Sequence, residues 1–107
     1  MSQQQQLLKK QELTVSQILR TYGKQYSQIT GQYSDGHDGR CALGVIMSYY
    51  GWDGVDKIEA GKKLSATWNA LDYTEIDRDL LIEMNDAGFT FDKIADYVDI
   101  ASNSKYC

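Results

Sequence analysis

The sequence predicts an all-α domain, a bundle of about five helices around a central apolar helix. Three observations lead to this prediction. Apolar residues recur at helical spacing along most of the chain, proline is absent, and the run DGRCALGVIMSYYG at residues 38–51 is apolar in an otherwise polar sequence. At 107 residues the chain has the size of one domain. We expect residues 1–6 to be a disordered lead-in and residues 7–107 to form a single helical domain.

The first predicted helix starts after Thr14. Gln17 follows three residues later, which completes the pattern of a capping box. Gly23 is the predicted helix stop. Residues 23–40 contain four glycines and two Asp-Gly pairs. Because these residues favour turns, we expect either a long loop or a short hairpin that turns at one of the two pairs.

The central helix is predicted over residues 41–50. It is apolar on nearly every side, which is typical of a buried helix. Gly44 within it costs about 1 kcal/mol relative to alanine, so we expect this glycine to let another backbone approach closely. Gly51 is predicted to end the helix, and Trp52 to fold back onto it.

The C-terminal half is predicted to contain the remaining helices. Residues 55–71 form one or two of them. Thr74 is the predicted N-cap of the next helix, which ends at Gly88, and Thr90 is the predicted N-cap of the last. The predicted buried residues are Ile76, Leu80, Leu81, Met84 and Ala87 in the first of these helices and Phe91, Ile94, Ala95 and Val98 in the second.

Charge is distributed unevenly along the chain. Residues 72–107 hold nine acidic and three basic groups, a sum of −6 within a total of −4. Phosphate repels such a surface, so direct nucleic-acid binding is disfavoured. No stretch approaches the roughly 18 apolar residues of a membrane span. The start has no apolar signal-peptide core, so we expect a cytoplasmic protein with free thiols and no membrane partner.

Two rows of carboxylates at helical spacing form the candidate binding face. Like charges at this spacing repel one another by a few tenths of a kcal/mol, about 0.2–0.5 per pair. Such a face either confers solubility or docks a basic partner, including a nucleic-acid-binding protein whose site it would block. We favour a small protein-binding, adaptor or inhibitor module and leave its oligomeric state open. The rows are Glu75, Asp79 and Glu83, and Asp92, Asp96 and Asp99.

Asn85 and Asp86 form a further candidate site. They lie near a helix C-terminus, the unfavourable end for a carboxylate because the helix dipole is negative there. In a structural interpretation their side chains cap the next helix or hold the turn at Gly88. In a functional interpretation they form a small polar site near the central helix.

Cys41 and His37 suggest an alternative function, a cysteine-dependent enzyme or thiol switch. Cys41 stands at a helix start, where the pKa of a thiol is lowered, and His37 is four residues away. The competing interpretation is a small buried residue that fills a gap. A catalytic site also needs an orienting group and an oxyanion pocket, which the sequence does not indicate. We therefore favour an inert thiol and no enzyme. One histidine and one cysteine make a weak ligand set, so we predict no metal and no cofactor.

Residues 85–98 have the cadence of a helix-turn-helix, which makes a DNA-binding regulator the second alternative. The outward positions include Asp92, Lys93 and Asp96. A recognition helix presents basic or amide side chains instead, so we favour helix-pair packing.

Two motifs carry a resemblance to a known group of proteins. One is Cys-Ala-Leu-Gly followed by an apolar run, and the other is Asn-Asp, a glycine, and a Ser/Thr-capped helix containing Ile-Ala. Together they resemble a group of small, uncharacterised bacterial and archaeal proteins, a domain of unknown function. Members often have tryptophan before Asn-Asp, where this chain has Met84. The resemblance implies a shared fold and transfers no activity. The matching positions are Cys41, Ala42, Leu43, Gly44, Asn85, Asp86, Gly88, Thr90, Ile94 and Ala95.

Overall fold

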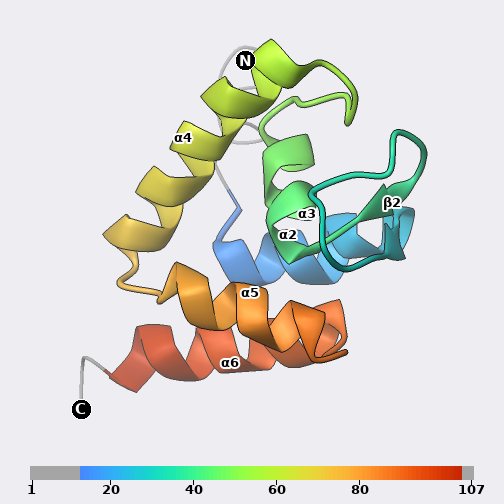
Figure 1. Ribbon diagram of the computed structural model, residues 1–107. Coiled ribbons are helices and arrows are strands. Elements are labelled where there is room, and N and C mark those ends of the chain that lie inside the picture. The colour runs from blue at the N-terminus through green and yellow to red at the C-terminus, as the bar shows by residue number, and fades with distance from the viewer. Residues whose placement is uncertain (1–12, 105–107) are drawn as a thin grey trace, which may run out of the picture.

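The computed structural model describes residues 13–104, and the predicted lead-in at residues 1–6 lies outside them, as does Cys107. Within this range the chain forms five α-helices and one two-stranded sheet, which confirms the all-α prediction (Figure 1). The elements are α2 (Val15–Thr21), the 3-10 helix η1 (Tyr22–Gln25), β1 (Ser27–Gln28), β2 (Gly39–Arg40), α3 (Ala42–Tyr49), α4 (Lys57–Tyr73), α5 (Arg78–Asp86) and α6 (Phe91–Ser104).

Helix α3 is the centre of the fold. It packs against α2, α4 and α5, and every residue from 42 to 47 is buried (Figure 1). Gly44 has its predicted role, because a Cβ at this position would overlap the carbonyl oxygen of Tyr33. Gly51 follows the helix with a φ of 109°, and the Trp52 amide donates to the Met47 carbonyl at 3.1 Å. The predicted extent, burial and end of this helix are therefore confirmed.

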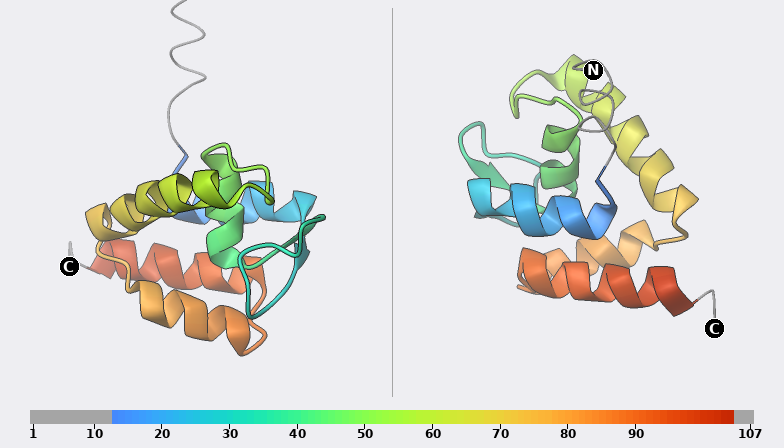
Figure 2. Two further views of the ribbon diagram at one scale, coloured as in Figure 1. Left: turned by 45° about the horizontal axis from the view of Figure 1, so that its top comes forward. Right: turned by 180° about the vertical axis from the view of Figure 1, so that it is seen from behind.

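Helices α2 and α6 form the second layer of the core. They lie side by side, and α5 also packs against α6 (Figure 2). The capping box of Thr14 and Gln17 is present at the start of α2. Thr90 caps α6 as predicted, since its hydroxyl accepts from the Lys93 amide at 3.2 Å. The predicted inward residues of α6 are all buried: Phe91, Ile94, Ala95 and Val98.

The segment between α2 and α3 differs from the prediction. The α-helix α2 ends at Thr21, close to the predicted stop, but the chain continues through Gly23 as the 3-10 helix η1. A Cβ on Gly23 would come 2.8 Å from Phe91 Cδ2.

The predicted turn at the Asp-Gly pairs is present, because Ser34 and Arg40 form an antiparallel bridge across residues 35–39. The strands β1 and β2, however, pair in parallel, which a simple hairpin does not produce. The chain reverses twice between them, first near Gly31, where φ is 83°, and again at a turn held by Asp35. Two reversals restore the original direction, whereas a single Asp-Gly turn would have produced antiparallel strands.

The junction of α4 and α5 also differs. Residues 57–73 form one helix, and Thr74 is its C-cap, with a hydroxyl that donates to the carbonyls of Ala70 and Leu71 at 3.0 and 3.1 Å. The N-cap of α5 is Asp77, whose carboxylate accepts from the amides of the first turn. The prediction of Thr74 as the N-cap of α5 is therefore wrong, because its hydroxyl caps the end of the preceding helix α4 instead.

The buried stripe of α5 is only partly as predicted. Ile76 and Leu81 are buried and Met84 is half-buried, but Leu80 is 37% exposed and Ala87 is exposed. The residue that completes the inward face is Asn85, four positions after Leu81 and 2% exposed. A polar side chain at an inward position requires hydrogen-bond partners, and these define the site described next.

Candidate ligand pocket and acidic helix face

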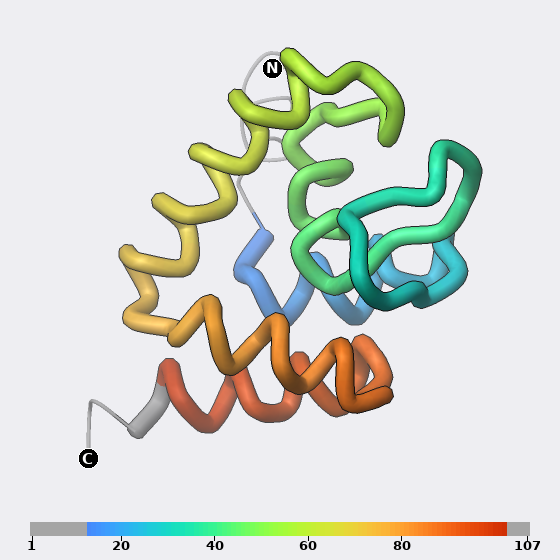
Figure 3. Tube along the Cα trace, viewed as in Figure 1, coloured from blue at the N-terminus to red at the C-terminus, as the bar shows by residue number. Residues whose placement is uncertain are grey.

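A buried arginine organises the loop on one side of the site. Arg40 is 4% exposed, and its guanidinium donates to Ser34 Oγ at 3.1 Å, to the His37 carbonyl at 2.7 Å and to Ser48 Oγ at 2.9 Å. Its carbon Cζ also lies 4.6 Å from the centre of the Tyr26 ring. Burying a cation requires that its donors be satisfied, and here oxygen dipoles and an aromatic face do so. The loop at residues 29–39 is thereby held beside the start of α3 (Figure 3).

Asn85 joins three segments behind this loop. Its Oδ1 accepts from the Ala42 amide at 3.0 Å and from Gln28 Nε2 at 2.9 Å, and its Nδ2 donates to the Ile29 carbonyl at 2.8 Å. Ala42 is the first residue of α3, so the amide of Asn85 satisfies one of the free N–H groups at the start of that helix. The structural interpretation was right in kind, although the helix that Asn85 caps is α3 and not the next one along the chain.

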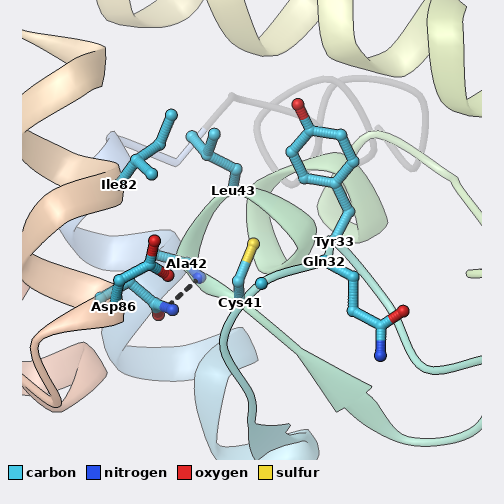
Figure 4. Close-up of a pocket in the computed structure, with 9 residues that line it drawn as sticks. Gln32, Tyr33, Cys41, Ala42, Leu43, Ile82 and Asp86 are labelled. Carbon is cyan, nitrogen blue, oxygen red and sulfur yellow. Dashed lines mark hydrogen bonds between the residues drawn. The ribbon is translucent and has the colours of Figure 1, made fainter.

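A cavity of about 340 Å³ opens where α5, the start of α3 and residues 31–33 meet. Figure 4 shows Asp86 and Ile82 on one side, Tyr33 on the other and the sulfur of Cys41 between them; the dashed line is the bond from the Ala42 amide to Asn85. Leu43 adds to the apolar wall. The first three residues of the Cys-Ala-Leu-Gly motif and both residues of the Asn-Asp pair thus meet at one cavity.

Cys41 lines this cavity without the character of a nucleophile. It is the N-cap of α3, and its Sγ accepts from the Gly44 amide at 3.4 Å. Burial raises the pKa of the thiol above its ordinary value, and the nearby Asp86 carboxylate acts in the same direction; the Gly44 amide offsets this in part. At neutral pH the group is therefore a protonated thiol, and its reactivity as a thiolate is suppressed.

His37 does not meet Cys41 in a catalytic arrangement. It is exposed within the turn held by Asp35, whose Oδ1 accepts from the His37 amide at 2.8 Å. Its carbonyl serves Arg40. Within residues 13–104 no hydrogen bond joins the His37 and Cys41 side chains, and His37 is not among the residues of the cavity.

The predicted carboxylates lie in two settings. On α6, Asp96 and Asp99 bind Arg20 of α2, with Arg20 nitrogens 2.6 and 2.8 Å from their oxygens. The pKa of Asp99 is lowered, first by the Ser16 hydroxyl and then by Arg20. Asp92 lines a shallow cavity of about 250 Å³ together with Lys24. Asp96 and Asp99 thus pair with Arg20 of α2, whereas Asp92 forms no ion pair among the described residues.

The α5 acids have no such partners. Asp79 and Glu83 are exposed, and Asp86 continues their row at the end of the helix. Positions i, i+4 and i+7 share one helix face, and Ile82 lies beside them. Glu75 precedes the helix and is exposed, with a φ of 60°. Among the described residues no lysine or arginine forms an ion pair with any of these four carboxylates.

The remaining predictions concern metals, membranes and the family. Within residues 13–104 no group of three or more His, Cys, Asp and Glu side chains is placed to hold a metal ion. None of the described helices has both the length and the apolar character that crossing a membrane requires. No protein-family model, curated protein or solved structure matches the chain. The resemblance to a domain of unknown function therefore stays a prediction.

Proposed function

We propose that the protein is a small protein-binding module that docks a basic segment of its partner along α5. The observation that carries this proposal is the row of carboxylates Asp79, Glu83 and Asp86. They share one helix face and have no cationic partner in the described chain, whereas Asp96 and Asp99 on α6 are engaged by Arg20. Unpaired like charges attract a complementary surface and accelerate its association.

The position of Asp86 strengthens this potential. It is the last residue of α5, where the helix dipole contributes a partial negative charge of about half a unit. A carboxylate there is unfavourable in the free protein and becomes favourable once a cation binds. The row therefore becomes more attractive to cations toward the end of α5 that lies beside the cavity.

The two alternatives have less support. A thiol enzyme needs a thiolate and a base, but burial raises the pKa of Cys41 and His37 lies in a separate turn. A DNA-binding regulator needs a helix that presents cations to phosphate, but α6 presents Asp92 and Asp96. A binding module requires neither feature.

The test uses isotope-labelled protein and a capped peptide of lysine and alanine with a lysine at every fourth residue. On binding we expect amide shifts along α5 and in residues 31–33. The double variant Asp79→Asn/Glu83→Gln should raise Kd roughly two- to thirtyfold, since two exposed pairs contribute about 0.2–1 kcal/mol each. Binding should also weaken as salt is added.

The matched control is Asp72→Asn/Asp92→Asn, which removes the same charge from α4 and α6. Both residues are exposed and outside the α5 row. We expect this variant to bind nearly as the natural protein does. If it loses as much affinity as the α5 variant, the peptide responds only to net charge and the proposed docking surface is wrong.

A further inference from the structure

The cavity beside Cys41 lies at the end of the α5 carboxylate row, and its lining indicates what enters it. We infer that the cavity takes the side chain of one lysine or arginine of the docked segment, with its charged head at Asp86 and its aliphatic stem against Leu43 and Ile82. The inference rests on the proposed function, because it assigns a specificity pocket to that docking surface.

The size and wall of the cavity fit such a side chain. Its volume of about 340 Å³ is at the small end of the range for ligand sites, about 300–1,000 Å³. Leu43 and Ile82 supply an apolar wall next to one carboxylate (Figure 4). Lysine and arginine bury their hydrocarbon stems on apolar surfaces while the charged head stays at a polar group. A wholly polar ligand would leave this wall unused.

The polar groups of the lining select a cation over an anion. Anions bind helix N-termini through free amides, but the amides at the start of α3 are already engaged. The Ala42 amide donates to Asn85 and the Gly44 amide donates to Cys41 Sγ. What the cavity offers is the Asp86 carboxylate, which has no ion-pair partner among residues 13–104, and the ring of Tyr33 opposite it. Gln32 also lines the cavity, but its side chain extends away from Asp86 (Figure 4). Carboxylates and aromatic rings both attract ammonium and guanidinium groups.

The experiment fills the cavity and removes its charge separately. Ile82→Phe places a larger side chain in the cavity, and Leu80→Phe makes the same kind of change at a 37%-exposed position on another face of α5. With the lysine–alanine peptide we expect Ile82→Phe and Asp86→Asn each to raise Kd about fivefold or more, and Leu80→Phe to change it less than about twofold. A peptide in which each lysine in turn becomes norleucine identifies the inserted residue, since one position alone should abolish the shifts at Leu43 and Ile82.

A second measurement does not depend on these variants folding. In a Cys107→Ser background, the occupied cavity should slow alkylation of Cys41 by iodoacetamide, and the peptide lacking the inserted lysine should not. A free amine is tested with n-butylamine, which should protect Cys41 only weakly.

The outcomes separate the inference from the proposed function. If the peptide binds and depends on Asp79 and Glu83 while the Cys41 rate, Asp86→Asn and Ile82→Phe show no effect, the pocket inference is overturned and the docking surface stands. If the peptide does not bind at all, the proposed function fails. If n-butylamine protects Cys41 as well as the peptide does, the occupant is a free amine and the assignment to a protein side chain is wrong.

Discussion

The hydrogen bonds of Asn85 make a quantitative prediction about folding. In the natural protein Asn85 lies 3.0 Å from the buried Ala42 amide nitrogen and 2.8 Å from the Ile29 carbonyl oxygen. In Asn85→Ala both groups lose this hydrogen-bond partner. A polar group left unsatisfied in the interior costs about 1–3 kcal/mol, so two such groups should lower the free energy of unfolding by about 2–6 kcal/mol. This is a large fraction of the stability of a small domain, about 5–15 kcal/mol. Gln28 keeps one acceptor, the Phe89 carbonyl at 2.6 Å, and adds little to the loss.

Urea unfolding followed by far-UV circular dichroism measures this loss, with an unchanged slope as the condition for comparing midpoints. The matched control is Asn69→Ala, at an exposed position of α4. Alanine is the better helix former, so this variant should be unchanged or more stable by up to about 0.7 kcal/mol. A loss below about 1 kcal/mol in Asn85→Ala would mean that water replaces the side-chain amide. The joint, by which we mean the hydrogen bonds of Asn85 to Ala42, Gln28 and Ile29, would then not be what holds these segments together.

Two further predictions follow from α3. Gly44→Ala should lower the free energy of unfolding by about 1–3 kcal/mol or more, because the added Cβ overlaps the Tyr33 carbonyl. The control Gly61→Ala lies in open space on α4 and should raise the free energy of unfolding by up to about 1 kcal/mol. Similar melting temperatures for the two variants would contradict this prediction. In a Cys107→Ser background the alkylation rate of Cys41 should reach its midpoint at a pH above the ordinary thiol value of about 8.5, because burial raises the pKa and thiolate forms only at higher pH. A midpoint below that value would instead favour the thiol enzyme.

The elements that the sequence predicted correctly carry unambiguous local signals. The capping box consists of Thr14 and Gln17, which lie three residues apart, and the cap at Thr90 precedes a regular apolar stripe. The apolar run of residues 41–50 is longer than most buried strands, which favours a buried helix. In each case residues within one or two turns decide the outcome, so no distant contact is needed to predict it.

The incorrect predictions depend on choices that local sequence leaves open. A threonine hydroxyl both donates and accepts, so Thr74 serves the end of α4 as readily as the start of α5. The capping role falls instead to Asp77, because a carboxylate only accepts. The relative direction of β1 and β2 depends on how many times the chain reverses between them, which local sequence does not determine.

The site was predictable only in pieces. Cys41, Asn85 and Asp86 were all singled out, but nothing local indicated that they share a cavity, because residues 41 and 85 meet only through tertiary packing. The buried state of Arg40 was missed for the same reason. Its hydrogen-bond acceptors come from residues 34, 37, 39, 48 and 53. Because these acceptors are brought together only by folding, the sequence alone suggests that a cation beside an apolar run lies on the surface.

The adjacency of Asn85 and Asp86 links the stability of the fold to the proposed binding. Consecutive helical residues point about 100° apart, so one side chain enters the joint with α3 while the next reaches the cavity. The bond from the Ala42 amide to Asn85 therefore fixes the distance between the Asp86 carboxylate and the Leu43 wall before any ligand arrives. A preformed site loses little conformational entropy on binding, so the affinity for the basic segment depends on how rigidly the Asn85 hydrogen bonds hold α5 against α3. Loosening Asn85 should consequently weaken binding even though Asn85 itself touches no cation, whereas Asp86→Asn should weaken binding and leave the joint intact.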